Sequence, residues 1–96
     1  MKTILYINKT IKLPFVDADY SNPFKMETVS NPFSGESVAI PKFAVTVYDV
    51  TMGCNHLAEL YDSKHGAGAS PLWYDVRKGL DWFREYFAKE YMVLLD

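Results

Sequence analysis

The sequence contains a single cysteine, Cys54, among its 96 residues. One thiol excludes an internal disulfide, and a zinc site would need three or four closely spaced thiolate or imidazole ligands, which this chain lacks. No apolar run approaches the ~20 residues that span a bilayer, and the first residues lack the apolar core and cleavage site of a signal peptide. We therefore expect a cytoplasmic protein that keeps its N-terminus, stays off the membrane and needs no cofactor.

Charge of one sign is also scarce. The 10 basic and 12 acidic side chains give a formal charge of −2, and both signs are scattered along the chain. No basic stripe of the kind that binds a phosphate backbone is present, so bulk nucleic-acid binding is not expected. Aromatic residues, in contrast, make up 16% of the chain and must enter a core or an interface. The length suits a single domain, residues 1–96, with its own core.

The start of the chain has the pattern of a β-hairpin. An alternating run over residues 4–7 breaks at Asn8-Lys9 and resumes over residues 10–13. Strands rich in β-branched and aromatic residues on both sides of a polar break predict a short hairpin, and Pro14 confines its second strand to an edge or ends it.

A second hairpin is predicted from an internal near-repeat over residues 21–38, in which each copy begins Ser-Asn-Pro-Phe. The turn residues of the second copy predict strands near Met26–Ser30 and Glu36–Ile40 around a turn at Asn31–Gly35. The Asn-Pro-Phe triplets are similar to short endocytic peptide motifs, but turn formation already explains each of them. We expect the hairpins of residues 1–40 to form one small antiparallel sheet.

Residues 41–96 are predicted to form two helices. Apolar residues between Pro41 and Tyr61 step by three or four, which predicts a helix over about 42–61 with one side in the core. That side carries Phe43, Val47, Val50, Thr51, Cys54, Leu57, Ala58 and Tyr61. The glycine-rich segment 62–69 then reads as a loop.

Ser70-Pro71 has the pattern of an N-cap followed by a first-turn proline, which opens a second helix that continues to about Tyr91. Its predicted core stripe is Trp73, Val76, Leu80, Phe83 and Phe87. Strands followed by helices indicate an α+β fold, with the hairpin sheet packed on the two C-terminal helices.

Residues with catalytic or metal-binding potential do not converge. Cys54 and His56 are two apart on the predicted helix and project to different sides, so we expect the cysteine to be an inert core residue. Asp49, His56 and Glu59 share an outer face, but a di-iron site needs the Glu-x-x-His motif twice, whereas here it occurs once and reversed. We therefore predict no catalytic residue, no metal site and no enzymatic activity.

The glycine loop offers a weak ligand site. Gly66, Gly68 and Ser70 lead into a helix N-terminus, where amide groups and the helix dipole can hold a phosphate. The lysine of a Walker loop and the strand of a dinucleotide fold are both missing, and Pro71 removes one donor. A plain inter-helix linker explains the same residues.

The second helix has an apolar sector wider than one neighbour needs, because Gly79, Trp82 and Tyr86 extend it beyond the core stripe. Aromatic anchors dominate binding hot spots, and glycine admits another backbone closely. We assign a candidate interaction surface to Trp82, Tyr86, Gly79 and Asp75. The alternative is that the chain's own strands cover this flank.

Four segments resemble a known group of proteins: NPFSGE at 31–36, AVTVYD at 44–49, KGLDWFR at 78–84 and EYMVLLD at 90–96. With them the chain is similar to small uncharacterised bacteriophage proteins over residues 30–96. No catalytic residue, cofactor or substrate is attached to that group. The resemblance therefore implies only a context, which is expression inside an infected bacterium.

Three classes of function remain. The first is a non-enzymatic accessory protein that binds and modulates a host bacterial protein, through the Trp82/Tyr86 flank or an exposed hairpin edge. The second is an assembly or virion component, for which a symmetric homo-oligomer would cover the same flank. The third is a small-ligand or nucleotide binder that uses the loop at residues 66–70.

Overall fold

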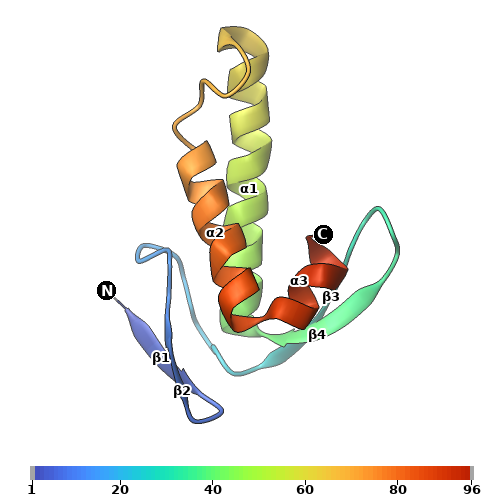
Figure 1. Ribbon diagram of the computed structural model, residues 1–96. Coiled ribbons are helices and arrows are strands. Elements are labelled where there is room, and N and C mark those ends of the chain that lie inside the picture. Colours follow the sequence, from blue (N-terminus) through green and yellow to red (C-terminus); the bar gives the residue numbers. More distant parts are fainter. Residues whose placement is uncertain (1, 96) are drawn as a thin grey trace.

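The computed structural model describes residues 2–95, so Met1 and Asp96, which the predicted domain and the last sequence motif include, lie outside the described residues. The described chain forms two hairpins followed by helices, which confirms the α+β class (Figure 1). The strands are β1 (Thr3–Tyr6), β2 (Lys9–Lys12), β3 (Met26–Ser30) and β4 (Ser37–Pro41). The helices are α1 (Lys42–His65), α2 (Trp73–Tyr86) and α3 (Ala88–Leu94).

The first hairpin turns one residue earlier than predicted. Tyr6 pairs with Lys9, so the turn consists of Ile7 and Asn8, with φ values of 48° and 60°. Two consecutive positive φ values define a type I′ turn, whose twist matches that of the flanking strands. Asn8 suits this conformation, whereas the β-branched Ile7 does not.

The second hairpin confirms the predicted strand Met26–Ser30, which pairs antiparallel with β4 from Ser30↔Ser37 to Met26↔Pro41. The two hairpins do not join into the one sheet expected from the sequence but form separate two-stranded sheets. Figure 1 shows them on either side of the lower end of the α1–α2 pair. Each hairpin buries its apolar face against helices, which leaves no reason for the strands to pair with one another.

The second predicted helix is divided at Phe87. This residue leaves helical geometry, with φ −137° and ψ 56°, and separates α2 from α3. Its ring is buried, with its centroid 5.8 Å from that of Phe43 and 5.5 Å from that of Trp82. The bend allows this ring to enter the core and redirects the chain so that α3 lies against β4.

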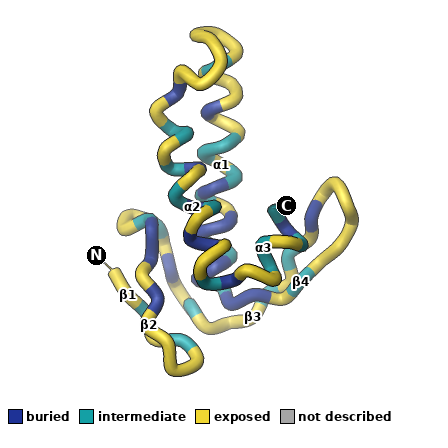
Figure 2. Tube along the Cα trace, viewed as in Figure 1, coloured by how far each residue is buried: buried dark blue, intermediate teal, exposed yellow. Residues whose placement is uncertain are grey.

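The core gathers where the hairpins meet the lower end of the helices (Figure 2). Phe43, at the start of α1, is fully buried among the rings of Tyr6, Phe24, Trp82 and Phe87. Higher up, α1 extends beyond this cluster, and Leu57 is 55% exposed. This corrects the predicted apolar side of the first helix, because among its far-end residues Ala58 is buried whereas Leu57 and Tyr61 are exposed.

The two long helices approach closely at one point. Gly79 of α2 is buried against Thr51 of α1, and a Cβ built on Gly79 would collide with the Thr51 side chain.

No helix within residues 2–95 is both long enough and apolar enough to cross a membrane.

Candidate functional site

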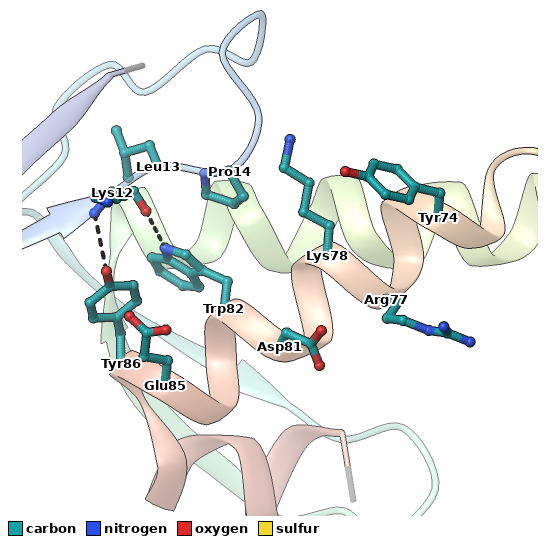
Figure 3. Close-up of a pocket in the computed structure, with 10 residues that line it drawn as sticks. All are labelled: Lys12, Leu13, Pro14, Tyr74, Arg77, Lys78, Asp81, Trp82, Glu85 and Tyr86. Carbon is teal, nitrogen blue, oxygen red and sulfur yellow. Dashed lines mark hydrogen bonds between the residues drawn. The ribbon is translucent and has the colours of Figure 1, made fainter.

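Trp82, the centre of the predicted interaction surface, belongs to the core. It is only 5% exposed, and its indole N–H donates a 2.6 Å hydrogen bond to the carbonyl of Lys12 (Figure 3). Its ring meets Phe43 edge to face, with centroids 6.2 Å apart. The end of β2 therefore seals Trp82, so that at this residue the alternative holds in which the chain's own strands cover the flank. Periodicity revealed a wide apolar sector, but not which element covers it.

Tyr86 lies beside Trp82, with ring centroids 5.6 Å apart, and is half-buried. Its hydroxyl accepts a 3.5 Å hydrogen bond from the backbone N–H of Lys12, and the Lys9 ammonium lies 5.2 Å from its ring centroid. A hydrogen bond with the Glu85 carboxylate raises the pKa of the Tyr86 hydroxyl, and burial adds to this effect. Tyr86 therefore helps to hold the first hairpin on α2.

The other two residues predicted for this surface lie elsewhere. Gly79 faces α1, so the close approach that its lack of a side chain permits is made within the chain. Asp75 is half-buried near Cys54 and lines a separate hollow with it. The structure thus brings Trp82 and Tyr86 together and separates Gly79 and Asp75 from them.

A groove remains above the sealed tryptophan. It has a volume of about 440 Å³ and runs between α2 and residues 12–14. Pro14 and Trp82 form its floor, and Tyr74, Lys78 and Tyr86 stand along it (Figure 3). The flank is therefore concave, with aromatic and charged side chains around an apolar floor.

Cys54 does not have the character of a nucleophile. It is half-buried in α1, and burial together with the nearby Asp75 carboxylate raises the pKa of its thiol. A protonated thiol reacts poorly. His56 is exposed on another side of the helix, and no group of three or more potential metal ligands is found within residues 2–95.

The glycine loop is closed by a carboxylate of the chain itself. Asp62 accepts hydrogen bonds from the N–H groups of Gly68 at 2.7 Å and Ser70 at 2.9 Å, and from the indole N–H of Trp73 at 2.6 Å. Burial would raise the pKa of Asp62, but these donors outweigh it and keep the pKa below its usual value. The amides proposed to hold a phosphate are therefore already occupied, and the Gly66 N–H binds the Asp62 carbonyl.

The tip of the second hairpin is organised by the side chain of Asn31, which is itself buried. Its carbonyl oxygen accepts hydrogen bonds from the N–H groups of Phe33 at 2.8 Å and Ser34 at 3.4 Å. Its amide nitrogen donates a 3.0 Å bond to the carbonyl of Val93 in α3. One side chain therefore shapes the tip loop, residues 31–36, and ties it to the C-terminal helix.

Backbone contacts complete this tip loop. The Asn31 N–H donates to the Glu36 carbonyl at 2.7 Å, and the Gly35 N–H donates to the Asn31 carbonyl at 2.9 Å. Phe33 stands on this framework with 94% of its surface exposed, the largest exposed fraction of any large hydrophobic residue in the described chain. The loop therefore presents an aromatic side chain that contributes little to the core.

The first copy of the triplet behaves differently. Phe24 stacks on Tyr6, with centroids 6.3 Å apart and an interplanar angle of 7°, and lies edge to face with Phe43. The Pro23 carbonyl accepts a 3.0 Å bond from the N–H of Phe43 at the start of α1. The same three residues thus support the core in one copy and project from it in the other.

Comparison with known proteins finds no family model, no curated protein and no solved structure that matches this chain. Asn31, Phe33 and Asp62 were not singled out as functional residues by the sequence. The near-repeat was the available signal for Phe33, because it places a phenylalanine at the same position in both copies.

Proposed function

We propose that this chain is a non-enzymatic protein-binding module that docks through Phe33 at the tip of its second hairpin. The observation that carries this proposal is the 94% exposure of Phe33 on a loop whose backbone is fixed by the buried Asn31. An exposed phenylalanine gains little for folding, whereas burying its ring in a partner removes a large apolar surface from water.

Rigidity makes the tip loop suitable for docking. A flexible loop loses conformational freedom when it binds, and this loss weakens association. The bonds from Asn31 to Phe33, Ser34 and Val93 impose that order before any partner arrives. Phe33 can therefore act as an anchor for an apolar pocket on a partner, with the polar Ser34 and Glu36 at its rim.

The resemblance to small bacteriophage proteins supports a protein of the bacterial host, met in its cytoplasm, as the partner. Self-association through the same tip is the second candidate, since one exposed ring can also enter another copy. The occupied amides of the glycine loop argue against nucleotide binding at residues 66–70.

Capture from a bacterial lysate tests the proposal. Immobilised wild-type chain is expected to retain a specific protein that Phe33→Ala does not retain. Ile7→Asn is the matched control, because Ile7 is 79% exposed at the tip of the other hairpin. Equal retention by wild type and Phe33→Ala contradicts docking through this residue.

Sizing of the purified chain separates the two candidates. A dimer that dissociates in Phe33→Ala supports self-association. Thermal unfolding of Phe33→Ala should match the wild type within about 0.5 kcal/mol, as for other surface substitutions, so a lost interaction would not reflect a lost fold.

A further inference from the structure

The groove between α2 and residues 12–14 combines an apolar floor with a positive rim. Lys12, Arg77 and Lys78 line it together with the acidic Asp81 and Glu85. Asp81 lies 3.2 Å from the guanidinium of Arg84, so its charge is offset on the helix itself. The local balance is therefore positive on a chain whose formal charge is −2.

The three cations of the groove have no carboxylate within ion-pairing distance among residues 2–95. Lys78 is half-buried, and its ammonium lies 5.8 Å from the ring centroid of Phe15. In Figure 3 its side chain points from α2 toward the segment that contains Pro14. Asp17 and Asp75 line the adjoining hollow on which Lys78 also borders, but neither forms an ion pair with it.

We propose that this groove binds an extended acidic peptide segment of a partner protein. An apolar side chain of the peptide lies over Pro14, between carboxylates that face Lys78 at one end and Lys12 at the other. Lys12 lies at the Tyr86 end, since its backbone N–H binds the Tyr86 hydroxyl. The helix rises ~1.5 Å per residue, so the two ends are about 12 Å apart.

This separation sets the pattern of the peptide. An extended chain advances ~3.3 Å per residue, so the two acidic residues stand about four positions apart with the apolar residue between them. A nucleic-acid strand fits less well, because each nucleotide carries a charged phosphate and none brings an aliphatic side chain to the apolar floor at Pro14, whereas a peptide supplies one between its two carboxylates.

Fluorescence anisotropy with a labelled peptide, Gly-Ser-Asp-Ser-Leu-Ser-Asp-Ser-Gly, tests the proposal on the full chain. The peptide is expected to bind, and binding should weaken as salt is raised. A peptide with lysine at both aspartate positions should not bind, and one with serine in place of leucine should bind more weakly. Equal binding of the three peptides overturns the proposal, as does binding of a single-stranded oligothymidylate in preference to the acidic peptide.

Charge variants place the peptide in the groove. Lys78→Glu should weaken binding about fivefold, and Glu85→Lys should strengthen it by a similar factor. Lys64→Glu, at the far end of α1, is the matched control and should leave binding unchanged. A gain of affinity in Glu85→Lys cannot come from loss of fold. If Glu85→Lys binds the peptide no more tightly than the wild type, the peptide does not bind in this groove. Phe33→Ala should bind the peptide like the wild type, which separates this site from docking through the tip loop.

Discussion

The tip loop, residues 31–36, and the glycine loop, residues 66–70, are built by the same device. In each, one side-chain oxygen group collects backbone N–H groups that no helix or strand satisfies: Asn31 serves the first loop and Asp62 the second. Sequence patterns marked the glycine loop as a weak ligand site, with a plain linker as the alternative, and treated the tip loop as a simple turn. The structure reverses their availability, because the donors of the glycine loop are occupied while Phe33 of the tip loop is exposed.

The two loops differ in which groups remain exposed once Asp62 or Asn31 has accepted its hydrogen bonds. Asp62 is charged and also engages the indole of Trp73, so this loop folds back on the start of α2. Asn31 is neutral and buried, and it turns the backbone so that Phe33 faces solvent. A loop with many turn residues is therefore not a binding site merely because it contains glycine. A loop can bind a partner only if its hydrogen-bond donors or its apolar side chains remain unoccupied by the rest of the chain.

The largest expected effect comes from Asn31→Ala. The substitution removes the acceptor of two backbone N–H groups and the donor to Val93 at a buried position, so unfolding free energy should fall by roughly 1–3 kcal/mol. Urea unfolding followed by circular dichroism measures this loss. Asn31→Asp keeps the acceptor but buries a charge and sets a carboxylate oxygen against the Val93 carbonyl, so it should lose at least as much. A loss no larger than that of an ordinary surface substitution would show that the loop holds its shape without Asn31.

The glycines of the two loops should respond alike. Gly35 and Gly68 have φ values of 77° and 76°, and a Cβ built on either meets nothing within 4 Å. Alanine at either position should therefore cost only the left-handed backbone conformation, roughly 1 kcal/mol. Gly53, which has open space inside α1, is the control, since Gly53→Ala should stabilise the chain by up to ~1 kcal/mol. A clearly larger loss at Gly68 than at Gly35 would mean that the closed loop is under additional strain.

The smallest expected effect is a pH dependence of stability, which should be present for the glycine loop and absent for the tip loop. The hydrogen-bond donors around Asp62 outweigh burial and hold its folded-state pKa below the ordinary value of an aspartate, so its stabilising contribution is present above that ordinary value and is lost as pH falls through the folded pKa. The melting temperature of Asp62→Asn should therefore lie below that of the wild type at neutral pH, and the two should converge in acid. The gap between Asn31→Ala and the wild type should not change over the same range. A gap at Asp62 that is independent of pH would contradict the role given to its charge.

Local structure was predictable where neighbours along the chain determine it. The strand Met26–Ser30 and the start of α1 after Pro41 follow from turn residues and periodicity, and both appear where expected. The break at Phe87 was not predictable, because no proline or glycine marks it. It arises from the packing of that ring against Phe43 and Trp82, which only the assembled core supplies.

The candidate sites were less predictable than the fold, since their partners are distant in sequence. Asn31 acts through Val93, 62 residues away, and the indole of Trp82 is sealed by Lys12, 70 residues away. Gly79 was expected to admit the backbone of a partner, but the residue that approaches it is Thr51 of α1 in the same chain. The pattern of apolar side chains on one helix shows which face of that helix must be buried, but it does not show which segment of the chain buries it.

The contact between Gly79 and Thr51 divides the pair of helices α1 and α2 into an inner part near the hairpins, which is tightly packed, and an outer part near the glycine loop, which is less tightly packed. On the side of the hairpins, α1 and α2 are held by the core. On the side of the glycine loop, Ala58 is the fully buried apolar residue of α1, and Asp62 binds the indole of Trp73 near the end of the helix. The outer part of the pair can therefore fray while the inner part stays folded. A protease that cuts near Gly66 is therefore expected to loosen only the part of the helical pair beyond this contact, and to leave the groove and the tip loop folded.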